Sequence, residues 1–180
     1  GGALFIENSK LTFSFYDQQQ LKSFHNRTSN DNKIDFHAYS LSFLKSNHVK
    51  RTEFLNETEF VENYYLGDKS TWASNVNHYE KLVQNNIYEG IDLILYEDKN
   101  NLKYDLYLHK NSNYKNIKIK YSGQSNMTLR DGNLIISTSV NTITELNPYA
   151  YQIIEQDTVE VECNYILKNS YLSFDLPNSF

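Results

Sequence analysis

Apolar and polar residues alternate along much of this chain, most clearly in its middle. Residues 90–96 are almost wholly apolar, residues 97–101 are polar, and residues 102–108 alternate between the two kinds. This order predicts two strands joined by a tight polar turn. The first strand is apolar at every position after Gly90 except Asp92. We therefore expect it to be covered on both faces, inside a sheet rather than at its edge.

Shorter alternating segments predict further strands on either side of this hairpin. They cover residues 3–6, 11–16, 37–43, 117–121, 127–130, 134–138, 142–146, 149–155, 159–167 and 171–176. The pair Asp131-Gly132 tolerates the positive φ angles of a tight hairpin turn. In total we expect about ten to twelve short strands spaced about 8–12 residues apart, as in sandwiches and barrels. The predicted fold is all-β, an antiparallel β-sandwich-like domain with at most one short helix.

Three segments fit no single pattern. Residues 78–88 have the spacing of a short helix but also fit an irregular strand leading into a turn. Residues 54–63 follow neither period. Residues 17–33 are the most polar part of the chain, and we interpret them as an exposed, partly disordered loop anchored by Leu21 and Phe24. We expect one domain over 1–180, with a subdivision near 64–72 into sheets at 1–63 and 73–180 left open.

Composition supports a β fold and excludes several classes of partner. The 15 tyrosines and 10 phenylalanines favour strands, and the net charge of −5 is spread along the chain. No basic cluster predicts nucleic-acid binding, and no apolar run is long enough to insert in a membrane. The single cysteine, Cys163, excludes an intrachain disulfide, and its place in an alternating segment indicates a small buried side chain.

Several strings recur in an order typical of one family. They are Tyr64-Tyr65-Leu66-Gly67-Asp68, Trp72-Ala73-Ser74, Ile87-Tyr88-Glu89-Gly90-Ile91-Asp92-Leu93, Leu102-Lys103-Tyr104-Asp105, Ile119-Lys120-Tyr121-Ser122-Gly123, Asp131-Gly132-Asn133-Leu134 and Thr144-Glu145-Leu146-Asn147-Pro148-Tyr149-Ala150-Tyr151-Gln152. Together they resemble the uncharacterised N-terminal domain of large secreted bacterial proteins. Such proteins often carry β-propeller-type (SBBP) repeats, PKD or other Ig-like modules, and a gliding-motility or type IX sorting domain. Glu89 departs from the pattern, which has a proline before the glycine.

The resemblance implies export to the cell surface or the medium, but it supplies no activity and no catalytic residues. It also implies that the chain is one domain of a longer gene product. The expected partners are then other domains of the same polypeptide, with a surface protein or a glycan as further candidates.

The strongest candidate for catalysis is a pair of carboxylates, Asp92 and Asp105, on the two strands of the central hairpin. Two carboxylates at a suitable separation could hydrolyse a glycosidic bond. The simpler interpretation is that Asp92 bonds backbone amides at the start of its strand and that Asp105 forms a surface ion pair near Lys103. We therefore predict no catalytic residues and no enzyme.

Metal and cofactor sites also lack support in the sequence. None of the five histidines, His25, His37, His48, His78 and His109, has the spacing of a metal-binding pair. Asn26–Asn32 and Asp98–Asn101 offer oxygen ligands for calcium, but neither has the spacing of an EF-hand loop, and a solvated loop is the simpler interpretation. We expect no cofactor.

Three aromatic residues, Trp72, Tyr64 and Tyr65, are the best candidates for ligand contact. Exposed and coplanar rings there could stack on a sugar, whereas buried rings would be part of a β core. The preferred hypothesis is a non-enzymatic module of a secreted or cell-surface protein, with a structural, assembly or adhesive role. The alternatives are a carbohydrate-binding module and, least favoured, a glycoside hydrolase.

Overall fold

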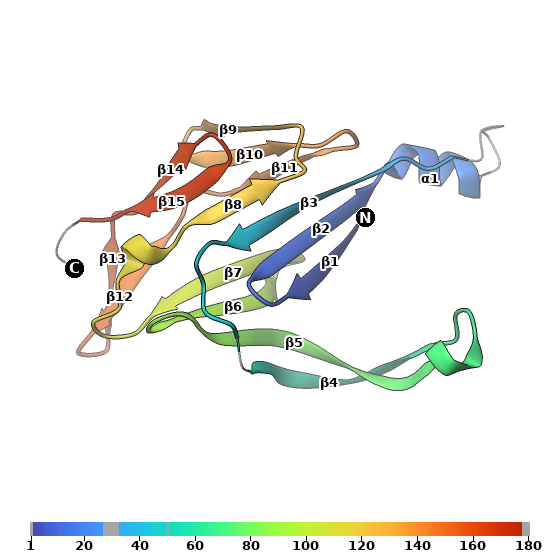
Figure 1. Cartoon of the computed structure of the whole chain (residues 1–180), viewed down its shortest axis with the longest axis horizontal. Coiled ribbons are helices and arrows are strands. Elements are labelled where there is room, and N and C mark those ends of the chain that lie inside the picture. The colour runs from blue at the N-terminus through green and yellow to red at the C-terminus, as the bar shows by residue number, and fades with distance from the viewer. Residues whose placement is uncertain (1, 27–32, 50, 178–180) are drawn as a thin grey trace. The chain divides into compact units, whose positions relative to one another are not determined.

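The computed structural model describes residues 2–26, 33–49 and 51–177, and antiparallel strands dominate them (Figure 1). Strands make up 62% of the described residues and helix 8%, so the predicted all-β fold is confirmed. The described residues contain fifteen strands. This exceeds the expected ten to twelve for two reasons. Segments 54–63 and 78–88, which fitted no single pattern, lie in strands, and segment 159–167, expected as one strand, is divided between two. The chain divides into two compact units, Gly1–Lys45 with Lys115–Phe180, and Ser46–Tyr114.

The first unit is built on a six-stranded sheet in the order β1-β2-β3-β8-β15-β14. These strands are β1 (Gly2–Glu7), β2 (Lys10–Tyr16), β3 (Phe36–Phe43), β8 (Ile119–Ser122), β15 (Tyr171–Asp175) and β14 (Asn164–Lys168). Every pair is antiparallel. Leu11 and Leu41 lie opposite each other on β2 and β3, and both are fully buried. The alternation of apolar residues in these strands therefore places one face of the sheet in the core.

Two smaller sheets complete this unit. One has the order β11-β10-β9 and the other pairs β12 with β13. Their bounds are β9 (Asn126–Arg130), β10 (Asn133–Ser137), β11 (Thr142–Glu145), β12 (Ala150–Ile154) and β13 (Asp157–Val161). Asp131 and Gly132 both have positive φ, as predicted for the tight turn between β9 and β10. The buried hydroxyl of Tyr121 on β8 donates to the carboxylate of Glu145 on β11 at 2.9 Å, which ties the larger sheet to the three-stranded one in a sandwich-like arrangement.

The second unit is a four-stranded antiparallel sheet in the order β4-β5-β6-β7. Its strands are β4 (Thr52–Tyr64), β5 (Ala73–Tyr88), β6 (Ile91–Asp98) and β7 (Asn101–Leu108). β6 lies between β5 and β7, so the predicted interior position of the first central strand is confirmed. Ile91, Leu93 and Leu95 are buried, but the alternate residues are only half-buried. The expectation of full cover on both faces was therefore wrong: one face of β6 is fully buried and the other only in part.

The segment at 78–88 is a strand, and its irregularity has a local cause. The pairing of β5 with β6 shifts register between Gln84 and Tyr88, and Asn86 within that interval has a φ of +57°. The bulge breaks the period-two alternation, which is why a helical spacing also fitted the sequence. A subdivision was left open at residues 64–72. There Tyr64 ends β4, and residues 65–72 form the loop joining β4 to β5, with a 3-10 turn η1 at Lys69–Thr71.

The polar segment after β2 contains a helix, α1 (Gln18–His25), so its interpretation as a loop was wrong over these residues. The side chain of Asp17 caps the helix by accepting from the amides of Gln19 and Gln20. Leu21 is half-buried, but Phe24 is 47% exposed and does not act as the expected anchor. The rest of the segment, residues 27–32, lies outside the described residues. Within the described part of the chain, α1 is the one α-helix, and no helix is long and apolar enough to cross a membrane.

Candidate functional site

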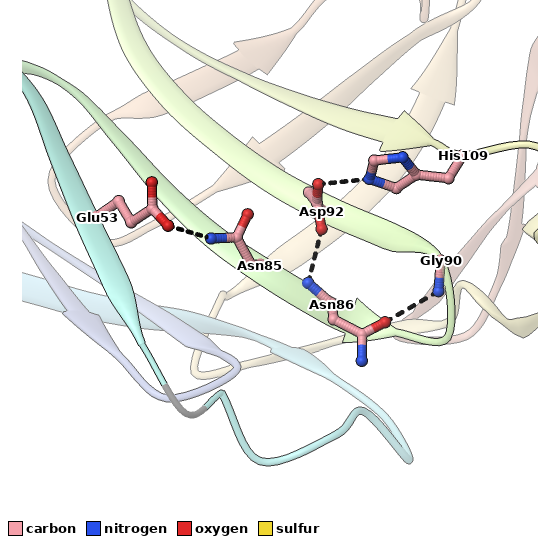
Figure 2. Close-up of polar contacts among 6 residues, drawn as sticks. All are labelled: Glu53, Asn85, Asn86, Gly90, Asp92 and His109. Carbon is pink, nitrogen blue, oxygen red and sulfur yellow. Dashed lines mark hydrogen bonds and ion pairs between the residues drawn. The ribbon is translucent and has the colours of Figure 1, made fainter.

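The carboxylate of Asp92, at the start of β6, is held by contacts with Asn86 and His109 (Figure 2). One of its carboxylate oxygens accepts from the backbone amide of Asn86 at 2.6 Å, and the other lies 2.7 Å from Nε2 of His109. The side-chain oxygen of Asn86 in turn accepts from the amide of Gly90 at 2.9 Å. These residues come from the end of β5, the turn, β6 and the residue after β7. Their contacts therefore hold the end of β5, the start of β6 and the end of β7 together.

The turn at Gly90 requires glycine. Its φ is +68°, and a Cβ added there would lie 3.1 Å from Cβ of Ser112. The amide of His109 donates to the carbonyl of Gly90 at 2.9 Å. The sequence predicted that Asp92 would bond a backbone amide at the start of its strand, and the bond to Asn86 confirms this. His109 was not predicted as its partner, because only the pairing of Ile91 with Leu108 brings the two side chains together.

Asp92 and Asp105, the two carboxylates weighed as candidates for catalysis, lie on the same face of the sheet but bond to different neighbours. Asp92 pairs across the strands with Tyr107, and Asp105 with Ile94, which makes the two aspartates diagonal neighbours. Asp105 accepts a hydrogen bond from the hydroxyl of Tyr96. Burial, together with the charge of Asp105 and this hydrogen bond, raises the pKa of Tyr96.

The surface ion pair expected at Lys103 forms with another residue. Nζ of Lys103 lies 2.6 Å from the carboxylate of Asp98, and this contact raises the pKa of Lys103. Lys99 and Asn100, between β6 and β7, both have positive φ. Asp98 therefore closes a tight hairpin turn, and its carboxylate is already neutralised by a lysine. This is a poor arrangement for a calcium ligand.

No group of three or more His, Cys, Asp and Glu side chains in the described residues could hold a metal ion. His37 illustrates the alternative use of a histidine. Its Nε2 lies 2.7 Å from the carbonyl of Gly123, and its Nδ1 accepts from the amide of Ser139 at 3.1 Å. Most of Asn26–Asn32, the other calcium candidate, lies outside the described residues.

The three aromatic candidates gather at the loop between β4 and β5, and all are exposed, at 44% for Tyr64, 55% for Tyr65 and 43% for Trp72. The rings of Tyr65 and Trp72 meet edge to face, with centroids 5.1 Å apart and planes at 63°. Nζ of Lys69 lies 5.9 Å from the centroid of the Trp72 ring. Tyr65, Trp72 and Lys69 are therefore packed on one another at the surface rather than in a core, while the hydroxyl of Tyr64 donates to Glu62.

The loop that carries these rings is ordered by its own polar contacts. The indole nitrogen of Trp72 donates to the carbonyl of Gly67 at 3.2 Å. The hydroxyl of Thr71 lies 2.7 Å from the carbonyl of Leu66 and 2.8 Å from that of Asp68. Because the exposed rings are held at fixed angles, the loop presents a preformed surface. It is not the coplanar platform that sugar stacking prefers.

We call residues 65–72 the aromatic loop. The hairpin formed by β4, this loop and β5, residues 52–88, is called the β4–β5 arm. Large apolar side chains are exposed along it. On β4 these are Phe54, Leu55, Phe60, Val61 and Tyr64. Register shifts interrupt the pairing of β4 with β5 between Glu57 and Val61 and again between Glu62 and Tyr64. The sequence did not reveal this surface, since apolar residues exposed on both sides of an irregular strand follow no period.

Comparisons with known proteins give a family and nothing finer. A family model described as "Domain of unknown function (DUF7948)" matches residues 1–180. No curated protein and no solved structure matches the chain.

Proposed function

We propose that this chain, which belongs to that family of domains of unknown function, is a non-enzymatic β-rich module of a secreted or cell-surface bacterial protein. Its role is structural, in assembly or in adhesion, and its partners are other domains of the same polypeptide or a surface protein. The observation that carries the proposal is the β4–β5 arm, whose apolar side chains are exposed while its loop is held in one shape. Exposed apolar surface of this kind is typical of protein interaction sites.

The groups best suited to catalysis are committed to other tasks, which supports a module without enzymatic activity. Asp92 has both carboxylate oxygens engaged in closing a turn. Cys163 is buried, and burial together with the charge of Asp175 raises its pKa to about 11. Since the thiolate is the nucleophilic form, this cysteine is poorly suited to attack a substrate.

The proposal is tested on the gene product that contains this chain. The double substitution Tyr65→Ala with Trp72→Ala removes the aromatic loop surface while leaving the buried residues unchanged. We expect the variant to reach the cell surface, as measured by protease shaving of intact cells, but to assemble less, as measured by sedimentation of the purified protein. Unchanged assembly would contradict the proposed role in assembly, and a wild-type protein retained inside the cell would contradict the proposed location.

A carbohydrate-binding module is the second candidate, favoured by the exposure of Trp72 and Tyr65. A glycan array probed with the wild-type chain and the same double variant separates the two. Assembly through protein contacts predicts no glycan signal above background. A glycan signal that disappears in the variant would favour the second candidate instead.

A further inference from the structure

β4 is an edge strand with an unusual charge. In the sheet order β4-β5-β6-β7, its described residues pair with β5 and with no other strand. Four of its thirteen residues are glutamates, Glu53, Glu57, Glu59 and Glu62, and none is lysine or arginine. An unpaired edge offers backbone N–H and C=O groups to any extended segment that can lie beside it.

Little basic charge within the arm balances these glutamates. The carboxylate of Glu53 lies 3.9 Å from Nε of Arg51, which is itself 79% exposed, and accepts from the side-chain amide of Asn85 at 2.8 Å. Glu57 accepts from the side-chain amide of Asn77, and Glu62 accepts from the hydroxyl of Tyr64 and lies 3.4 Å from Nε2 of His78. No ion pair to Glu59 occurs in the described part of the chain. The half of β4 nearest the aromatic loop therefore combines acidic charge with exposed apolar groups.

The acidic charge and the exposed apolar groups together determine which kind of segment can pair with the edge of β4. A second copy of the same edge would bring four glutamates beside four others with no lysine or arginine between them, and like charges close together across two strands are destabilising. Asn56, with a φ of +57°, also interrupts the strand, a device that limits pairing over its full length. Acidic and apolar groups occur on both faces of this half of β4, since Phe60 and Glu62 both contact His78 whereas Val61 is the next residue along the strand. An extended segment that carries both basic and apolar residues meets both features, because its cations can face the glutamates while its apolar side chains cover Phe60 or Val61.

We propose that the outer edge of β4, from Thr58 to Tyr64, is a docking site for such a basic, apolar segment of a partner protein, which adds to the sheet as a further strand. Main-chain hydrogen bonds then supply affinity, and the glutamates select the partner. The inference rests on the proposed role in assembly and names the chemistry of the partner. The β12–β13 hairpin is less suited as an acceptor, because its sheet has two strands and is less rigid on its own.

The test uses the full 180-residue chain and an eight-residue, fluorescein-labelled peptide of alternating lysine and valine. Fluorescence anisotropy measures its binding, with a glutamate–valine peptide of the same length as a control. Two further peptides carry N-methyl groups, one on its lysines and one on its valines, so that each lacks the N–H groups of alternate residues. We expect the lysine–valine peptide to bind, the glutamate–valine peptide not to bind, and at least one methylated peptide to lose binding. Equal binding of both methylated peptides and their parent would overturn strand addition.

Protein variants locate the site. The double variant Glu59→Gln with Glu62→Gln is expected to weaken binding of the lysine–valine peptide roughly tenfold, since two exposed charge pairs are lost. The matched control, Glu89→Gln with Glu97→Gln, removes the same charge from the β5–β6 turn and from the exposed part of β6 and should leave affinity unchanged. Equal losses in the two variants, or a loss in the control alone, would overturn the assignment to β4.

Amide chemical shifts of the wild-type chain give an independent location. Shifts caused by the peptide should concentrate at residues 58–64, and shifts confined to other strands would contradict the proposal. A failure in these binding tests removes the docking site alone. The proposed function fails separately, if substitutions in the aromatic loop leave assembly of the complete gene product unchanged.

Discussion

The imidazole of His109 lies 2.7 Å from the carboxylate of Asp92, and this contact joins the end of β7 to the start of β6. The two side chains belong to residues seventeen positions apart, and antiparallel pairing brings them together. Asp92 is largely shielded, with 15% of its side chain exposed, whereas His109 is 52% exposed. The carboxylate is thus the fixed partner, and the imidazole covers it from the solvent side.

Replacing Asp92 with alanine should destabilise the chain. The change leaves the amide of Asn86 without its acceptor and His109 without its partner. A hydrogen bond to a charged group contributes about 1.5–3 kcal/mol. Since Asn86 and His109 are both exposed, we expect a loss near the lower end of this range in the free energy of unfolding, measured by urea denaturation. Asp105→Ala is the control, because Asp105 is exposed and should cost less than about 1 kcal/mol. Equal losses for the two variants would contradict a special role for Asp92 in the turn.

Gly123→Ala should be among the most damaging glycine substitutions. Gly123 has a φ of +98°, and an added Cβ would lie 2.8 Å from the carbonyl of Ala38. Backbone strain and steric overlap therefore act together, and we expect a loss of about 2–4 kcal/mol. Gly67→Ala has a similar positive φ of +68°, but its Cβ would meet only the side chain of Thr71 at 3.6 Å. That control should cost about 1 kcal/mol, and thermal unfolding of both variants measures the difference.

The sequence predicted the elements whose two faces differ in polarity. The tight turn followed from the pair Asp131-Gly132, and the interior position of β6 followed from its nearly unbroken apolar run. The helix at Gln18–His25 could not be predicted in this way, because it buries no residue and so has no apolar face to detect. Its visible signal was the capping residue Asp17 before a run of glutamines, which are good helix formers.

Only part of the candidate site could be predicted from the sequence, because the exposure of its residues depends on how the strands pair. The aromatic residues of the loop were identified as ligand-contact candidates, but their exposure depends on whether a strand next to them lies inside a sheet or at its edge. No local pattern encodes that. The acidic edge of β4 was likewise hidden, since its glutamates become a surface only when β4 pairs on one side.

His37→Phe should loosen three segments at once. Nδ1 accepts from the amide of Ser139, and Nε2 must therefore carry the hydrogen that it donates to the carbonyl of Gly123. Phenylalanine fills a similar volume but supplies neither bond, so we expect a loss of about 1–3 kcal/mol. Hydrogen exchange should show faster exchange at Ser139 in the variant. An unchanged exchange rate there would contradict the role assigned to His37.

Cys163 predicts a loss of stability at alkaline pH. Its pKa is raised from an ordinary value near 9 to about 11, by burial first and by the charge of Asp175 second. The unfolded chain therefore loses this proton before the folded chain does. The contribution of Cys163 is constant below about pH 9 and is lost as the pH rises towards 11. Cys163→Ala should flatten the pH dependence of unfolding over this interval, and iodoacetamide should modify the folded wild-type chain slowly at pH 8.

Trp72, the single tryptophan of the chain, reports on the order of the aromatic loop. Its indole is exposed, yet it is held by the ring of Tyr65, by Lys69 and by a hydrogen bond to Gly67. Tyr65→Ala removes the edge-to-face contact, which is worth about 0.5–1.5 kcal/mol, with the low end expected at a surface. We therefore expect acrylamide to quench the fluorescence of this variant more strongly than that of the wild-type chain. The urea midpoint of global unfolding should stay nearly constant, because the loop contributes no buried residue. A large fall in the midpoint with unchanged quenching would mean that Tyr65 stabilises the sheet rather than the loop, and the loop would then not be a surface held by its own contacts.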